Sequence, residues 1–269
     1  KLDASGSGGE VQRTIAMQRS ESGTWVAKID SDLKGMYYTV RAKIDGKWNN
    51  EVTDPYARAA GVNGARAMVV DLKETNPIGW EKDKSPNFSE KNLATDAIIY
   101  ELHIRDATID KESGVKHKGK FLGLAETGTK NSAGQTTGLS HIKELGVTHI
   151  HLLPFYDYNS VDETKSAVQY NWGYDPVNYN IPEGSYSTNP ADGKVRIREL
   201  KELIKTMHSN GLRIVMDVVY NHTALTKNSN FNILVPDYYY RKRADGSFSD
   251  ASSCGNETAS EKAMFQKFM

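Results

Sequence analysis

Aromatic and polar residues that suit a sugar are concentrated in residues 170–176, which read Tyr-Asn-Trp-Gly-Tyr-Asp-Pro. The Gly, Asn, Asp and Pro of this segment favour an irregular loop, so its rings cannot all lie in a core. The flat faces of Trp172 and Tyr174 suit the C–H face of a sugar ring, and Asp175 suits its hydroxyl groups. The segment therefore predicts a carbohydrate-binding loop. Packing of the rings against the loop's own domain is the alternative.

A second polar group follows an apolar run further along the chain. Residues 216–223 read Met-Asp-Val-Val-Tyr-Asn-His-Thr and present Asp217, Asn221 and His222. An Asp on an isolated strand is more often a structural hydrogen-bond acceptor than part of a site. Here the run predicts a parallel strand, and chemistry in parallel α/β folds gathers at the carboxyl ends of strands. That position favours a functional site.

Three histidines suggest a different chemistry. His149 and His151 share one face of a predicted strand, and His103 lies on the preceding strand. Three such ligands could hold a catalytic zinc with one position left open. No acidic partner with metal-site spacing is nearby, so hydrogen-bonded histidines inside the fold are the favoured interpretation.

An oxygen-rich stretch leaves calcium open. Asp157, Asn159, Asp162 and Glu163 carry suitable ligand atoms, but the EF-hand pattern fails at Val161 and lacks its turn glycine. A solvated loop is the favoured interpretation, and an irregular calcium site is the alternative. We expect no metal or cofactor to be required.

The elements that must position these residues alternate between strand and helix. Apolar runs at 97–104, 147–153 and 212–219 predict strands, and the spacing of apolar residues predicts helices over 139–145 and 200–207. This alternation predicts a parallel sheet with candidate residues directly after each strand. A last helix is expected from about Thr258 to the final residue, Met269.

Residues 1–90 have a different character. Short runs rich in Tyr, Val, Ile and Trp, with the turn signal Asp45-Gly46, predict hairpins of an all-β module, most simply a sandwich. A polar stretch near residue 90 predicts the boundary with the α/β part.

The charge balance excludes several partners. The 269 residues contain 34 Lys and Arg and 34 Asp and Glu, without a basic run. Nucleic acid and anionic membranes are therefore not expected partners. No apolar stretch approaches the roughly 18 residues of a membrane span. The compartment stays open, with cytoplasmic and secreted or cell-surface locations both compatible.

Several stretches of the sequence resemble a known family. Residues 217–222 resemble the first signature region of the α-amylase superfamily, glycoside hydrolase family 13, and residues 170–176 resemble more narrowly the type I pullulanases, which debranch starch and glycogen. Further similar stretches are residues 100–106, 119–126, 146–154 and 235–240. The β-rich start is similar to the starch-binding-like sandwich that precedes the catalytic barrel in this family.

The resemblance implies roles for the matching positions. Tyr174 would stack on the sugar at the −1 subsite, and His222 would hydrogen-bond its primary hydroxyl. Asp217 would help to organise the catalytic carboxylates, Asn221 would hold the local loop or a calcium, and Asp175 would be a polar neighbour. The implied reaction is retaining hydrolysis of α-1,6-glucosidic linkages in pullulan and branched α-glucans.

The catalysts themselves are not assignable. Family members carry the nucleophile Asp on the fourth strand and the acid/base Glu on the fifth, and no residue here matches either. We therefore expect a multi-domain β plus α/β fold: a β-sandwich over 1–90, incomplete at its start, and the first three βα units of a (β/α)8 TIM barrel over 91–269. About 180 residues are short of the ~250 of a whole barrel. The isolated chain is predicted to be inactive unless a separate chain supplies the remaining barrel.

Two rival functions stay open at this stage. One is a metal-dependent amidohydrolase-type barrel that uses the three histidines. The other is a non-catalytic α-glucan-binding protein.

Overall fold

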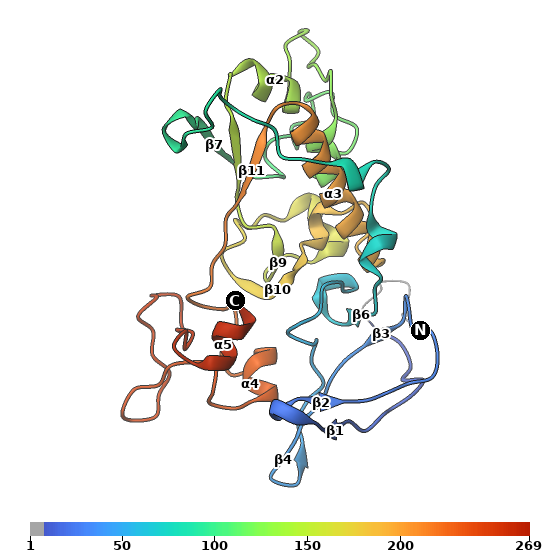
Figure 1. Cartoon of the computed structure of the whole chain (residues 1–269), viewed down its shortest axis with the longest axis vertical. Coiled ribbons are helices and arrows are strands. Elements are labelled where there is room, and N and C mark those ends of the chain that lie inside the picture. Colours follow the sequence, from blue (N-terminus) through green and yellow to red (C-terminus); the bar gives the residue numbers. More distant parts are fainter. Residues whose placement is uncertain (1–7) are drawn as a thin grey trace.

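A parallel sheet organises the second part of the chain in the computed structural model, which describes residues 8–269 (Figure 1). Its strands are β7 (Ile99–Leu102), β8 (His149–Leu152) and β11 (Arg213–Met216). β8 lies in the middle, and each of its residues pairs in register with one residue of β7 and one of β11. Strand order therefore follows chain order, which confirms the predicted βα alternation.

The longest helix follows from clear start and stop signals. α3 (Gly193–Ser209) begins where the Asp192 side chain accepts the Lys194 N–H, and the chain leaves it through Gly211 at φ +83°. Its apolar face, which includes the fully buried Leu203 and Met207, packs toward the sheet. Shorter helices pack beside it: α1 (Phe121–Ala125) and α2 (Gly138–Glu144).

The helices cover only one face of the sheet. On β8, Ile150 and Leu152 are fully buried under the helices, whereas His149 and His151 point to the opposite face and are half-buried. In residues 8–269 this sheet keeps β7 and β11 as its two edges and does not close into a barrel. The face that carries His149 and His151 can therefore contact residues that follow the strands, such as Asp217 after β11.

An aromatic cluster supports the last part of the chain. α4 (Asn230–Leu234) and α5 (Ala263–Phe268) pack Phe231, Phe265 and Phe268 against one another and against Tyr179. The predicted helix from Thr258 is wrong in its start, because the Thr258 N–H donates to the Asn221 carbonyl and holds an extended segment. The helix begins at Ala263 and ends at Phe268.

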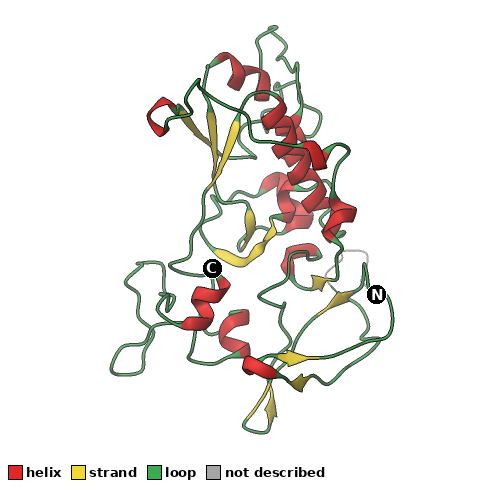
Figure 2. Ribbon diagram, viewed as in Figure 1, coloured by secondary structure: helices red, strands yellow, loops and turns green. Residues whose placement is uncertain are grey.

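Residues 8–90 form short antiparallel strand pairs joined by loops (Figure 2). The hairpin predicted at Asp45-Gly46 is confirmed, since both residues have positive φ and connect β4 to β5. The strands stay in separate two-stranded pairs, so the two facing sheets of a sandwich are not confirmed. The pairs are β1 (Gln18–Arg19) with β2 (Trp25–Val26), β3 (Tyr37–Tyr38) with β6 (Ala67–Met68), and β4 (Lys43–Ile44) with β5 (Lys47–Trp48).

This first part is attached directly to the second. The Tyr37 hydroxyl donates to the Ala191 carbonyl at 2.6 Å, just before α3. Met68 packs against Ile197 of the same helix, and Lys201 bonds the Leu72 carbonyl. The two parts therefore share buried surface along α3.

Two further strands, β9 (Tyr156–Tyr158) and β10 (Pro176–Pro182), lie between the sheet and the aromatic cluster (Figure 1). They pair antiparallel with irregular register.

Within residues 8–269, none of the helices has the length and apolar character that a membrane crossing requires.

The 3-10 helices are η1 (Glu21–Gly23), η2 (Val62–Gly64), η3 (Leu72–Thr75), η4 (Trp80–Lys82), η5 (Ala94–Asp96), η6 (Glu163–Val168) and η7 (Gly184–Tyr186).

Candidate glycan-binding site

The predicted carbohydrate-binding loop lines an open pocket of about 410 Å³. Trp172 is 60% exposed and Tyr174 is 36% exposed, so both rings present surface to solvent rather than to the core. The alternative of rings packed under the loop is therefore wrong for these two residues. The pocket is lined by Tyr170, Asn171, Trp172, Tyr174 and Asp175.

Hydrogen bonds within the loop fix its shape. The Asn171 side chain donates to the Asp175 carboxylate and to the Asn159 carbonyl, both at 2.8 Å, and accepts the Gly173 N–H. Gly173 has φ +90°, and a Cβ there would lie 2.6 Å from the Pro154 carbonyl oxygen. Only glycine fits this turn, which places Trp172 and Tyr174 on either side of it.

The Asp175 carboxylate is hydrogen-bonded to other protein groups in this structure. Its two oxygens accept hydrogen bonds from Asn171 at 2.8 Å and from the Ser160 hydroxyl at 3.1 Å. Burial raises the pKa of this carboxyl, while the bonds from Asn171 and Ser160 oppose the shift. Direct contact of Asp175 with a sugar stays a prediction.

Tyr174 is tied to the strand end. Its hydroxyl donates to Asp217 Oδ2 at 2.7 Å, across 43 residues of sequence. Burial, followed by the hydrogen bond to Asp217, raises the pKa of the Tyr174 phenol well above its ordinary value. The phenol therefore keeps its proton at neutral pH and acts as the donor.

Asp217 continues a polar row across the open face of the sheet. His151 Nε2 lies 3.5 Å from Asp217 Oδ2, and His151 Nδ1 lies 3.5 Å from Glu101 Oε2. Glu101 and His151 are register partners on β7 and β8, and Asp217 directly follows β11. Residues of β7 and β8 and the residue after β11 thus lie together at the carboxyl end of the sheet, where the sequence predicts a site.

His222 makes protein contacts through both ring nitrogens. Nε2 lies 2.7 Å from the Tyr174 carbonyl oxygen, and Nδ1 lies 2.9 Å from Asn221 Oδ1. The Tyr179 hydroxyl donates to the His222 carbonyl at 2.6 Å and fixes the backbone. A bond from His222 to a sugar hydroxyl, as the resemblance implies, requires one of these ring contacts to open or to be shared.

The histidines considered as zinc ligands do not converge. His103 is buried and bonded to Asn171 and Tyr186, whereas His149 contacts Thr148 and the Phe88 ring. Within residues 8–269 no histidine belongs to a cluster of ligand atoms suited to a metal. The zinc alternative is therefore wrong, because each ring faces different partners.

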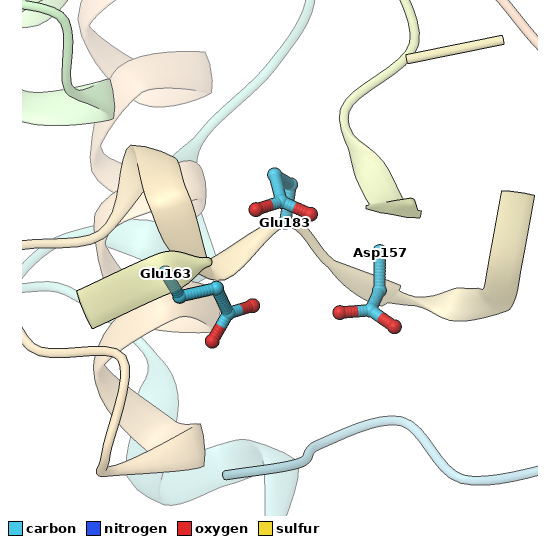
Figure 3. Close-up of side chains that lie close together, drawn as sticks. All are labelled: Asp157, Glu163 and Glu183. Atoms are coloured by element: carbon cyan, nitrogen blue, oxygen red, sulfur yellow. The ribbon is translucent and has the colours of Figure 1, made fainter. Parts of the chain in front are cut away.

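The oxygen-rich stretch forms a different kind of cluster. Figure 3 shows the carboxyl groups of Asp157, Glu163 and Glu183 around a common space, with ligand atoms within 4.8 Å of one another. Asp162 instead caps η6 by accepting the Thr164 N–H, and Asn159 is exposed. Two of the four residues considered for calcium thus lie outside the cluster.

The positive charge in this cluster comes from Arg196 of α3. Its Nη1 and Nη2 atoms lie 3.1 and 2.9 Å from the two oxygens of Glu163. The same guanidinium bonds the Gly61 carbonyl of the first part of the chain. Asp157 Oδ1 lies 3.7 Å from Nη1 and has no hydrogen-bond partner.

These contacts fit a buried ion pair better than a calcium shell. Calcium takes six to eight oxygens, but Glu163 is already occupied by Arg196 and by backbone N–H groups of Asn63 and Gly184. Burial, followed by the charge of Glu163, raises the pKa values of Asp157 and Glu183. Protons on these carboxyls therefore offset the surplus negative charge. Calcium binding stays a prediction.

The sequence predicted hydrogen-bonded histidines inside the fold, and His103 bonds Asn171 and Tyr186 as that interpretation requires. Asn171 and Glu101, which hold the loop and the polar row, were not singled out. Trp172, Tyr174 and Asp175 line one pocket, and their contact with a sugar stays a prediction. Asp217 and His222 bond Tyr174 directly, and Asn221 bonds His222.

The chain is similar in sequence to a known family and to known proteins. Residues 119–246 match the α-amylase catalytic domain. A pullulanase of Bacillus subtilis is 42% identical over 257 residues, which cover 96% of this chain and 35% of the relative. The chain thus spans about a third of the length of that relative.

Solved structures give the same picture. The apo pullulanase of Paenibacillus barengoltzii is 51% identical with a TM-score of 0.93, over 97% of this chain and 40% of that one. A pullulanase of Anoxybacillus sp. LM18-11, solved as a complex with maltotetraose, is 46% identical with a TM-score of 0.87, over 94% of this chain and 36% of that one.

Proposed function

Because the chain belongs to the α-amylase catalytic-domain family in residues 119–246 and is similar nearly throughout to one part of pullulanases, we propose that it serves the debranching of α-glucans. The proposed reaction is retaining hydrolysis of α-1,6-glucosidic linkages in pullulan and branched α-glucans. The substrate is an α-glucan, and the reaction class requires no cofactor.

One observation carries the proposal: Tyr174 is an exposed ring held by a 2.7 Å hydrogen bond to Asp217 at the carboxyl end of a parallel strand. An aromatic face fixed in this way can stack on a sugar without first losing side-chain freedom. Trp172 adds a second exposed ring across the turn. The complex of a similar pullulanase with maltotetraose supports an α-glucan as the ligand.

We further propose a division of labour within the enzyme. Residues 1–90 would form a starch-binding-like β module, and residues 91–269 the first three βα units of the barrel. The carboxylates next to Tyr174 are engaged by protein groups: Asp217 by Tyr174 and His151, and Asp175 by Asn171 and Ser160. The nucleophile and the acid/base are accordingly proposed to come from the remaining barrel strands, which a separate chain could supply.

Incubation with pullulan tests this division. We expect the 269-residue chain alone to release no reducing ends above a buffer control. Retaining enzymes use two carboxyl groups ~5–5.5 Å apart, whereas Asp217 and Asp175 are engaged by protein groups. An intact pullulanase provides the positive control. Turnover by the chain alone, within tenfold of that control, would overturn the proposed division.

A non-catalytic α-glucan-binding protein is the second candidate, because the exposed rings bind a sugar whether or not chemistry follows. Adding the separately produced remainder of the barrel separates the two candidates. Recovery of pullulan hydrolysis supports the enzyme. Binding that persists without hydrolysis in the reconstituted complex supports the binder.

A further inference from the structure

Two buried histidines hold the glycan-binding loop by its main-chain carbonyl oxygens. His103 Nε2 lies 2.9 Å from the Asn171 oxygen, and His222 Nε2 lies 2.7 Å from the Tyr174 oxygen. These carbonyls are on opposite sides of the turn at Gly173. The loop that presents Trp172 and Tyr174 is therefore fastened at both ends by imidazole groups.

The contacts of His103 select one protonation state. Its Nδ1 accepts the Asp106 N–H at 3.3 Å, so Nδ1 carries no proton. The proton then lies on Nε2, which donates to the Asn171 carbonyl and also lies 3.0 Å from the Tyr186 hydroxyl. The neutral Nε2–H tautomer satisfies every contact of the ring.

The surroundings of His103 oppose its protonation. The ring is buried, 5.0 Å from the Tyr170 ring and 5.8 Å from the Tyr186 ring. Burial lowers the pKa of His103, and the nearby Arg105 lowers it further, while the Asn171 carbonyl and Asp106 oppose this shift. A proton added at Nδ1 would face the Asp106 N–H, with the carboxylate of Asp106 3.7 Å away.

We infer that His103 is a positioning residue for α-glucan binding: in its neutral form it holds the Asn171 carbonyl and so presents Trp172 and Tyr174 to the sugar. The inference rests on the proposed function. Protonation of His103 puts the new Nδ1–H against the Asp106 N–H, whereas the Asp106 carboxylate, 3.7 Å from Nδ1, can accept it. Turning of the ring toward this carboxylate would draw Nε2 away from the Asn171 carbonyl and release the loop. Glycan affinity therefore falls in acid while the rest of the sheet stays folded.

Calorimetric titration of maltotriose into the full chain at pH 7.5 and pH 4.0 tests this role, the lower pH being chosen because burial lowers the pKa of His103. The wild-type chain is expected to lose at least about fivefold in affinity at the lower pH, the worth of one hydrogen bond. His103→Gln keeps a donor for Asn171 and an acceptor for Asp106, so it should bind within about threefold of wild type at pH 7.5 and show no acid loss. His103→Leu should bind weakly at both pH values.

His149→Gln is the matched control, because His149 is on the neighbouring strand and contacts Thr148 and Phe88 rather than the loop. It should keep the acid loss of the wild-type chain. An unchanged acid loss in His103→Gln, or its disappearance in His149→Gln, would overturn the inference. Since both glutamine variants keep a polar side chain, they test whether His103 causes the acid loss of affinity even if His103→Leu does not fold.

The same titration separates this inference from the proposed function. Maltotriose binding at pH 7.5 with an acid loss independent of His103 overturns only the role of His103. Absence of maltotriose binding by the wild-type chain at pH 7.5 overturns both. The ring proton signals of His103, identified as those missing from the His103→Gln spectrum, should titrate together with the affinity.

Discussion

The hydroxyl of Tyr174 connects the pocket-lining loop to the end of β11. Its bond to Asp217 joins residues 43 positions apart, and the raised pKa of the phenol keeps the donor protonated. The same side chain lines the pocket. It would therefore provide both the proposed stacking surface and the link that orients it.

Tyr174→Phe separates these two contributions. The ring is retained, but Asp217 loses its 2.7 Å donor. We expect maltotriose affinity to fall by about fivefold, the worth of one hydrogen bond, with unchanged folding. Calorimetry together with a thermal melt measures both, and an affinity equal to wild type would show that the hydroxyl orients nothing.

Residue types indicated the site, but not its supports. Trp172 and Tyr174 were predicted from their chemistry and from a loop-forming context. The bond from His103 to the Asn171 carbonyl spans 68 residues and involves a backbone atom, which no residue pattern marks. Residue chemistry therefore indicates exposed candidate groups more readily than the side chains that hold a backbone atom.

Among the contacts between elements, Arg196 joins α3 to the start of η6, through Glu163, and to the first part of the chain, through the Gly61 carbonyl. It is fully buried and bonds Glu163, the Gly61 carbonyl and the Pro190 carbonyl. A side chain with this many buried partners leaves several polar groups unsatisfied when it is removed. The ion pair is therefore expected to maintain the position of the first part against α3.

Arg196→Met tests that role. We expect the free energy of unfolding to fall by about 3–5 kcal/mol, because Glu163 is left buried without its partner. Lys205→Met on the same helix removes a partly exposed pair with Glu202 and an exposed bond to the Ile78 carbonyl, and should cost less than about 1 kcal/mol. Urea denaturation measures both; equal losses would contradict the role assigned to Arg196.

Asp157→Asn tests the buried protons. Burial raises the pKa of Asp157 to about 7, so the folded chain retains a proton that the unfolded chain loses above its ordinary value of 3.8. This carboxyl therefore makes the unfolding free energy fall as pH rises from about 4 to 7. Replacement by Asn should remove that part of the slope.

The half-buried Asp162 provides the control for this slope. The Thr164 hydroxyl and N–H lower its pKa, so its contribution to stability is lost as pH falls below about 4. Asp162→Asn should therefore change the slope in the opposite direction, below pH 4 rather than above it. Denaturation at pH 3, 4, 5.5 and 7 gives the comparison, and identical slopes between pH 4 and 7 for wild type and Asp157→Asn would refute the assignment.

Elements with strong periodicity were predicted well. The strands β7, β8 and β11 follow from apolar runs, and α3 from apolar spacing and Gly211, but α3 begins at Gly193, seven residues before the predicted 200–207. The start of α5 was not predicted, because Thr258 pairs with Tyr240 in an extended segment through contacts made in the folded chain. The first part was predicted as strands, but the contact of Met68 in β6 with Ile197 in α3 joins residues far apart in the sequence.

For the whole molecule, the sheet is covered on one face and open on the other. Ile99 and Met216, on the two edge strands, are 58% and 43% exposed. Apolar residues at sheet edges favour pairing with further strands. This is why the proposed enzyme places the remaining barrel strands there, and why the chain alone is expected to bind rather than cleave.

The loop around Gly173 is proposed to bind α-glucan through Tyr174. Calorimetric titration of maltotriose into the wild-type chain and into Tyr174→Ala tests this binding, with Val168→Ala as control, since that side chain is 85% exposed and does not line the pocket. Wild type and Val168→Ala should bind equally, and Tyr174→Ala at least about tenfold more weakly. Equal binding by all three chains would show that Tyr174 does not hold the sugar.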